Sequence, residues 1–124
     1  FRRGFRVSGN NRKGLRMALH VEVFRHRVDP SFQGEFDDLY DRLTTVVRGL
    51  RGYISHKVYV AEDGERMLVG YFESFDAIEE WDVHPEHKYA KDRGKDDVFT
   101  EYDVIVAEVV ERHTKPPARP GGEA

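Results

Sequence analysis

The stretch YISHKVYVAEDGERMLVGYFE, residues 53–73, decides the fold, because it has the pattern of two strands joined by a tight turn. Residues 53–60 and 66–73 are rich in β-branched and aromatic residues, which favour strands. The pair Asp63-Gly64 between them favours a short hairpin turn, since both residue types tolerate the backbone angles that such a turn needs. We therefore predict an antiparallel hairpin here.

The residues before the hairpin predict a strand followed by a helix. Residues 17–28 alternate and include several β-branched residues, as in a strand. Asp29 and Pro30 then suit the N-cap and the first position of a helix. Apolar residues recur every three or four positions after them: Phe32, Phe36, Leu39, Tyr40, Leu43, Val46, Val47 and Leu50. The helix is expected to run to about residue 48, where Gly49 and Gly52 end it.

The residues after the hairpin repeat this order. Ser74 is a good N-cap for a helical segment, which Pro85 restarts and Gly94 stops. The predicted buried side of this segment contains Phe75, Ile78 and Trp81. Residues 101–113 again have the composition of a strand. The order β-α-β-β-α-β predicts an α+β, ferredoxin-like fold, in which a four-stranded antiparallel sheet carries both helices on one face.

Both faces of this sheet are expected to be apolar, although the helices can cover only one of them. The side opposite the helices would hold Leu19, Val21, Val23, Met67, Val69 and Tyr71. An apolar sheet face of this size is unfavourable in water. We therefore predict a homodimer in which two sheets pack face to face.

Composition limits the classes of protein to which the chain can belong. It has 124 residues, enough for one domain, no cysteine, and no apolar run long enough to cross a membrane. The lack of cysteine excludes disulfides and thiolate sites, and with the lack of a signal-peptide pattern it fits a soluble, cytoplasmic protein. The net charge of −3 argues against a nucleic-acid partner, and nothing indicates a membrane partner.

Uneven charge divides the chain into three parts. Residues 1–16 hold six Lys or Arg and no acidic residue, whereas the remainder is acidic. We interpret this basic arm as a leader, a vector-derived extension ahead of Met17, or a segment that a partner subunit orders. Residues 17–113 are expected to form the folded domain, and the Pro/Gly-rich tail 114–124 is expected not to pack.

Five segments carry a resemblance to a known family. They are FRHRVDP (24–30), LRGYISHKVY (50–59), LVGYFESFDAIEEW (68–81), HPEHKYAKDRGK (84–95) and YDVIVAEVVER (102–112). Through them the chain resembles the antibiotic biosynthesis monooxygenase domain, one of the dimeric α+β barrels. The resemblance implies a homodimer with a pocket between sheet and helices in each subunit. It also implies an oxidoreductase of the monooxygenase type that acts with O₂ on an aromatic, quinol or polyketide-like substrate.

Haem-degrading members of this family use an Asn on the first strand, a Trp on the second helical segment and an axial His ten residues later. The corresponding positions here are Phe24, Trp81 and Lys91. A protonated lysine does not ligate haem, and His87, one helical turn earlier, is the residue that could replace it. Haem binding and degradation is therefore an alternative that lacks two of its three usual residues.

Anthrone oxygenases of the family use an Asn and a Trp on the third strand, a Tyr on the second helix and a basic residue further along. These positions hold Leu68, Phe72, Ile78 and Lys91 here, so the basic character alone is kept. The resemblance therefore favours cofactor-independent oxygenation by a different set of residues. A non-catalytic binding or stress-associated module, whose pocket its own side chains would fill, is the remaining alternative.

Residues 79–94, EEWDVHPEHKYAKDRG, hold the polar groups of the predicted pocket. His84 precedes a proline, which keeps it out of the helix, so we expect it to start the helix rather than to ligate a metal. His87 lies on one helical stripe with Ala90, Lys91 and Gly94, and the resemblance places this stripe toward the pocket. Alternatively, His87 is a satisfied core residue and Lys91 extends to solvent.

The first strand adds polar residues to the same pocket. The residues that alternate on its predicted helix-facing side are His20, Glu22, Phe24 and His26. Polar groups on a buried face are costly unless they are paired or solvated, and a polar pocket would accommodate them. In an alternative register these residues would meet solvent at the ends of the strand.

The reaction implied by the resemblance assigns roles to these residues. His87 is the candidate base, and Lys91 or Arg93 the cation beside the developing oxyanion. The candidates for a dry aromatic wall are Trp81, Phe24, Phe72 and Tyr71. Glu22, Leu68 and Ile78 complete the predicted substrate-binding set. No cofactor and no metal are expected, because the substrate itself would reduce O₂.

Overall fold

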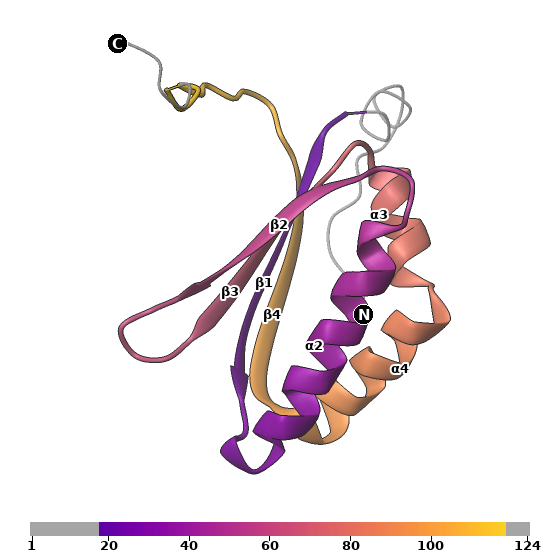
Figure 1. The fold of residues 1–124 in the computed structure, drawn as a ribbon, viewed down its shortest axis with the longest axis vertical. Coiled ribbons are helices and arrows are strands. Elements are labelled where there is room, and N and C mark those ends of the chain that lie inside the picture. The colour runs from indigo at the N-terminus through magenta and orange to yellow at the C-terminus, as the bar shows by residue number, and fades with distance from the viewer. Residues whose placement is uncertain (1–17, 119–124) are drawn as a thin grey trace.

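A four-stranded antiparallel sheet with helices on one face forms the domain, as the computed structural model shows for residues 18–118 (Figure 1). The elements are β1 (His20–Val28), α2 (Gln33–Arg48), β2 (Tyr53–Val60), β3 (Arg66–Phe72), α3 (Phe75–Asp82), α4 (Pro85–Arg93) and β4 (Phe99–Glu108). The strand order is β2-β3-β1-β4. The ferredoxin-like α+β prediction is confirmed, and the predicted basic arm 1–16 lies outside the described residues.

Side-chain caps begin the helices where the sequence predicts them. Asp29 caps the 3-10 turn that leads into α2, Ser74 caps α3 and His84 caps α4. Each side chain accepts a hydrogen bond from an amide that no helical carbonyl reaches. His84 has extended backbone angles, φ −61° and ψ 133°, so it starts α4 as predicted.

The end of the last helix and the bounds of the last strand add detail to the prediction. α4 ends at Arg93 with Gly94 at its C-cap, as predicted, but Gly94 keeps helical angles and the chain continues through a π-helical turn, Gly94–Val98, into β4. Glycine is needed there for another reason: a Cβ would lie 2.5 Å from a ring carbon of Phe99. β4 spans 99–108 instead of 101–113, since its neighbour β1 begins at His20, opposite Glu108.

Cross-strand pairing sorts the side chains onto the two faces of the sheet. On the helix side, one row joins His56, Gly70 and Glu22 and the next joins Val58, Leu68 and Phe24. The helix-facing register predicted for β1 is therefore confirmed, and the alternative register is wrong. Rows on the other face include Tyr59, Met67, Val23, Val69 and Ile105.

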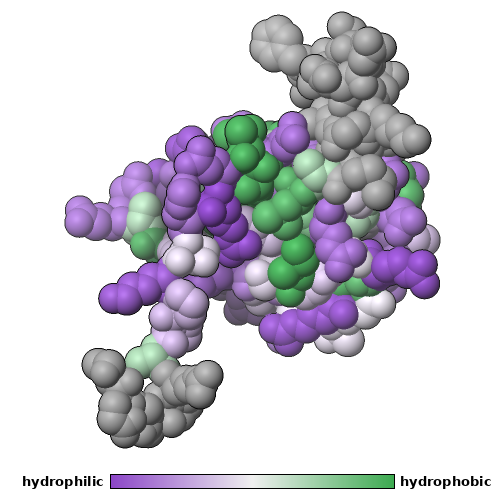
Figure 2. Space-filling model, turned by 90° about the horizontal axis from the view of Figure 1, so that it is seen from above, coloured by the Kyte–Doolittle hydropathy of each residue, from purple (hydrophilic) through white to green (hydrophobic). Residues whose placement is uncertain are grey.

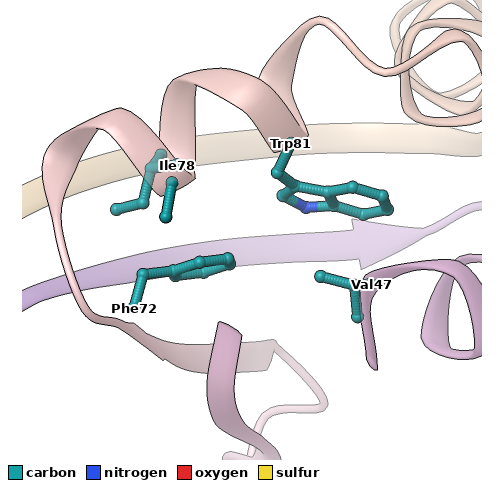
Figure 3. Close-up of a cluster of buried hydrophobic side chains, with 5 residues drawn as sticks. Val47, Phe72, Ile78 and Trp81 are labelled. Carbon is teal, nitrogen blue, oxygen red and sulfur yellow. The ribbon is translucent and has the colours of Figure 1, made fainter. Parts of the chain in front are cut away.

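The core lies between the sheet and the helices. Its buried cluster consists of Val47, Phe72, Ala77, Ile78 and Trp81. Figure 3 shows Ile78 and Trp81 pointing down from α3 toward Phe72 of β3 and Val47 of α2. Side chains of α2, β3 and α3 thus converge on one apolar centre, which fixes the helices over the sheet.

The opposite face of the sheet is partly exposed and holds apolar side chains, with Arg25, Lys57 and Asp103 in the same rows. Tyr59 and Ile105 are 48% and 47% exposed, and Val23, Met67 and Val69 are half-buried. Figure 2, which views the molecule from above and not onto this face, shows hydrophobic side chains in the middle of the molecule with hydrophilic ones around them. The helices therefore leave one apolar sheet surface uncovered within residues 18–118.

Two glycines with positive φ provide a matched test of packing between the start of β2 and α3. Gly52 and Gly64 have φ near +90°, but a Cβ on Gly52 would lie 2.5 Å from Cβ of Ala77, whereas one on Gly64 meets nothing within 4 Å. Gly64→Ala should cost about 1–2 kcal/mol for the left-handed backbone. Gly52→Ala should cost about 1–3 kcal/mol more, because it also overpacks the helix contact. Denaturant unfolding measures both, and equal losses would contradict the contact.

Candidate active site

A cavity of about 140 Å³ lies between the sheet and the helices. Its aromatic lining residues are Phe24, Phe36, Tyr40, Tyr53, Phe72, Trp81, Phe99 and Tyr102. Leucines and valines fill much of the remaining wall, and the small residues Gly70, Ala90 and Gly94 also line the cavity. A concave, mostly apolar cavity with few polar groups is the usual form of a small-molecule site.

His87 is a neutral, oriented imidazole at this cavity. Its ring is stacked on the indole of Trp81, with centroids 4.1 Å apart and an interplanar angle of 13°. Its Nδ1 lies 3.0 Å from the carbonyl oxygen of Trp81, which can only accept, so Nδ1 carries the proton. Burial, with a smaller contribution from the Lys91 ammonium, lowers the pKa of His87 to about 4. At neutral pH, Nε2 therefore carries a lone pair.

Lys91 lines the cavity beside His87, but its ammonium is already paired. Nζ donates to the backbone oxygen of Asp82 at 2.6 Å and to its carboxylate at 2.8 Å. Both side chains are 16% exposed, so Lys91 does not extend into solvent. The last residue of α3 thus fixes a cation at the corner where α4 begins.

Arg93 does not reach the cavity as the predicted alternative cation. Its guanidinium forms ion pairs with Glu35 at 2.6 Å and with Asp97 at 2.6 Å, and these hydrogen bonds raise its pKa. It therefore connects α4 to α2 and to the following turn. This part of the prediction is wrong, because the side chain serves the packing of helices.

A second group of polar side chains lies at the β2 side of the cavity and was not anticipated from the sequence. His56 stands between two phenols: Tyr53 Oη lies 2.7 Å from Nδ1, and Tyr40 Oη lies 3.1 Å from Nε2. Burial, followed by the nearby Arg48 charge, lowers the pKa of His56. The three side chains come from α2 and β2, and all three line the cavity.

His26 is the third imidazole of the cavity wall and is 2% exposed. Its Nδ1 lies 3.3 Å from the carbonyl oxygen of Phe24, while its Nε2 is buried and has no partner among residues 18–118. Burial lowers its pKa to about 4, and the Arg66 charge adds to this. His26 therefore contributes a neutral ring, packed 4.4 Å from the ring of Phe24.

Most of the predicted site residues meet at this cavity. Those that line it are Glu22, Phe24, Leu68, Phe72, Trp81, His87 and Lys91. Ile78 lies in the core cluster instead and is fully buried. Tyr71 is on the opposite sheet face, where the guanidinium of Arg112 lies 4.8 Å from its ring, so its assignment to the aromatic wall is wrong.

Metal ligation and membrane insertion find no support in the part of the chain that the structure describes. Within residues 18–118, no three His, Asp or Glu side chains gather as a metal site. The helices of the same range are each too short or too polar to cross a membrane.

Comparison with known proteins places this cavity in a known fold. A relative from Bacillus subtilis, the uncharacterized protein YqjZ, is 30% identical over 74 residues, which are 60% of this chain and 65% of YqjZ, so less than two thirds of that relative is matched. Rv0793 from Mycobacterium tuberculosis has a similar structure, with a TM-score of 0.69 and 19% identity over 78% of this chain and 100% of its own.

A mutant of SnoaB, described as a cofactor-independent oxygenase from Streptomyces nogalater, has a TM-score of 0.66 and 12% identity over 79% of this chain and 99% of its own. At these identities, both solved structures show the fold alone. The family model for antibiotic biosynthesis monooxygenases matches residues 19–93, which include β1 to α4 and most of the cavity wall. The chain belongs to the antibiotic biosynthesis monooxygenase family.

Proposed function

We propose that the chain is a cofactor-independent monooxygenase that oxidises a one-ring quinol or phenol with O₂. One observation carries this proposal: a neutral, oriented imidazole, His87, shares an aromatic cavity with the paired ammonium of Lys91. A base and a fixed positive charge in a water-poor site are what deprotonation of a hydroxyl group requires.

The size of the cavity selects the substrate class. At about 140 Å³ it is close to the cavity of about 150 Å³ that accepts a benzene molecule in an engineered protein. A single substituted ring therefore fits, whereas a fused polyketide needs the walls to move. Among the expected aromatic, quinol and polyketide-like substrates, we therefore propose one-ring compounds.

The chemistry balances without a cofactor. A 1,4-quinol, C₆H₆O₂, reacts with O₂ to give a hydroxyquinone, C₆H₄O₃, and water. The substrate supplies the electrons: one oxygen atom forms a new C–O bond, and the other is reduced to water. His87 Nε2 is proposed to accept a hydroxyl proton, and the Lys91 ammonium, held by Asp82, to stabilise the anion left behind. Similarity in fold to a solved structure described as a cofactor-independent oxygenase supports the proposal.

Oxygen uptake tests this function. Protein treated with a metal chelator should consume O₂ with hydroquinone at neutral pH, faster than the same buffer without protein. His87→Gln should lower the rate at least a hundredfold, the usual contribution of a positioned base. Lys88→Ala is the matched control, because its side chain is exposed on the same helix. No uptake above the buffer rate across a panel of one-ring quinols would overturn the proposal.

The size of the cavity counts against haem. A macrocycle of four pyrroles is several times larger than the single ring that about 140 Å³ accommodates, and Phe24 lines that space. Lys91, at the axial position, is bound to Asp82. Titration with haem should therefore give weak binding without a stoichiometric endpoint. A sharp one-to-one Soret band that His87→Ala removes would show that the cavity opens far more than its walls suggest.

The cavity also counts against a non-catalytic module filled by its own side chains. That alternative predicts a closed interior, but His87 and Glu22 line open space.

We further propose a homodimer through the uncovered sheet face, because Val23, Val69 and Ile105 are apolar neighbours there.

A further inference from the structure

In the hydrogen-bonded group Tyr40–His56–Tyr53, His56 and Tyr53 come from β2 in the sheet and Tyr40 comes from α2, whereas His87 comes from α4. His56 comes from the edge strand β2 and shares its row with Gly70 and Glu22. Gly70 and His56 both line the cavity, and Gly70 adds no side chain to this part of its floor. The cavity therefore has hydrogen-bonding groups on two of its walls.

Each phenol of this group keeps hydrogen-bonding capacity for a ligand. A neutral imidazole has one N–H and one lone pair, so one phenol donates to His56 and the other accepts from it. The donating phenol keeps oxygen lone pairs, and the accepting phenol keeps its own hydrogen. Tyr53 also packs against the core cluster, and its 2.7 Å contact is the shorter of the two. Tyr40, at 3.1 Å, is the member best placed to turn toward a ligand.

We propose that Tyr40 and His56 form a second hydroxyl-binding and proton-accepting site, so that the cavity takes a ring with two hydroxyl groups. This deepens the proposed function, on which it rests for the identity of the substrate. One hydroxyl group of a 1,4-quinol would meet His87, and the other would donate to Tyr40 Oη. The site selects a quinol over a phenol with one hydroxyl group.

The proton transfer balances within the group. His56 begins neutral, with Nδ1–H donating to Tyr53 and Nε2 accepting from Tyr40. The substrate hydroxyl proton moves to Tyr40 Oη as the Tyr40 proton moves to Nε2. The products are a substrate oxyanion, an intact Tyr40 phenol and an imidazolium whose two N–H groups donate to Tyr53 and Tyr40. Burial and Arg48 disfavour this cation, so the proton is readily returned to the reduced oxygen when water forms.

Calorimetry in oxygen-free buffer tests the second hydroxyl site apart from catalysis. The probes are hydroquinone and 4-methoxyphenol, in which a methyl group blocks one hydroxyl proton. Wild-type protein should bind hydroquinone about five- to tenfold more tightly, the effect of one added hydrogen bond. Tyr40→Phe should bring the two affinities within about twofold of each other. Tyr89→Phe, a change at a 52% exposed tyrosine, should keep the wild-type preference.

Proton acceptance has its own readout. In His87→Gln protein, which lacks the other proposed proton acceptor, bound 4-nitrophenol should absorb more strongly as nitrophenolate than the free compound does at the same pH, and the further change His56→Phe should abolish this shift. Equal affinities for the two calorimetric probes in wild-type protein would overturn the proposal, as would an unchanged preference in Tyr40→Phe. Loss of oxygen uptake with an intact preference would instead remove the proposed oxygenation and leave this site standing.

Discussion

Between pH 7 and pH 4 the protein should lose stability on the order of 3 kcal/mol through each of two buried histidines, His26 and His87. Burial lowers both pKa values from 6.5 to about 4. In this window the unfolded chain binds protons that the folded chain excludes, so the free energy of unfolding falls as pH falls from about 6.5 to 4. Above pH 6.5 this contribution is fully present.

The pH range in which stability is lost distinguishes the histidines from the carboxylates. Hydrogen bonds lower the pKa of Asp29, Glu35 and Asp63, so their contribution is lost below about pH 4.5. The charged groups that act on His26 are Arg66 and Glu65; those that act on His87 include Lys91 and Asp82. A loss that begins near pH 6.5 therefore belongs to the imidazoles.

Replacing one ring checks the assignment. His26→Phe keeps an aromatic ring in a pocket of phenylalanines and removes a buried nitrogen that has no partner within residues 18–118, so the variant should fold at pH 7. The free energy of unfolding is measured with denaturant at pH 7 and at pH 4.5. Its fall between these two pH values should be about 2–3 kcal/mol smaller in the variant than in the wild type. Identical pH dependence in the two proteins would contradict the buried, neutral His26.

The dimer should dissociate when one charge is placed on the uncovered sheet face. Val69 of β3 lies between Lys57 of β2 and Val23 of β1, and Ile105 continues that row on β4. Each Å² of apolar surface that two such faces bury contributes about 25 cal/mol, or many kcal/mol over a standard interface. Val69→Arg would bury an unpaired cation there, and the free energy needed to desolvate this charge should destabilise the dimer.

Light scattering in low and high salt measures this. The wild-type mass should be that of two chains in both buffers, because burial of apolar surface is not screened by salt. Val69→Arg should give one chain, while Thr45→Arg, which adds the same charge on an exposed part of α2, should stay dimeric. Wild-type monomers at micromolar concentration in both buffers would contradict the interface. Dissociation in high salt alone would assign assembly to charged contacts.

Local sequence signals predicted the fold well, because each of them acts over a few residues. Asp63-Gly64 turns the hairpin, and Asp29, Ser74 and His84 cap helices where their hydrogen bonds are local. Gly94 follows the last residue of α4 as predicted, but its second role was not predicted, because that role depends on the ring of Phe99, which the π-helical turn brings against it. In a sequence, a glycine that ends a helix cannot be distinguished from a glycine that is needed because another side chain packs against it.

The cavity wall was predicted largely through family resemblance, and the polar contacts within it were not predicted. The pairing of Lys91 with Asp82 depends on the angle between α3 and α4, which no pattern specifies. The Tyr40–His56–Tyr53 group joins α2 to β2. Alternation along β2 already places His56 on the same side as Val58, so its inward direction could have been found, but its two phenol partners could not.

Labelling with ¹⁸O₂ tests the central claim most directly. Chelator-treated protein is supplied with hydroquinone and ¹⁸O₂, and the product is analysed by mass spectrometry. Monooxygenation in the cavity predicts a hydroxyquinone that carries one ¹⁸O atom, with the second ¹⁸O atom in water. Unlabelled benzoquinone with labelled hydrogen peroxide would contradict the account, because it would show that the protein only promotes electron transfer to O₂.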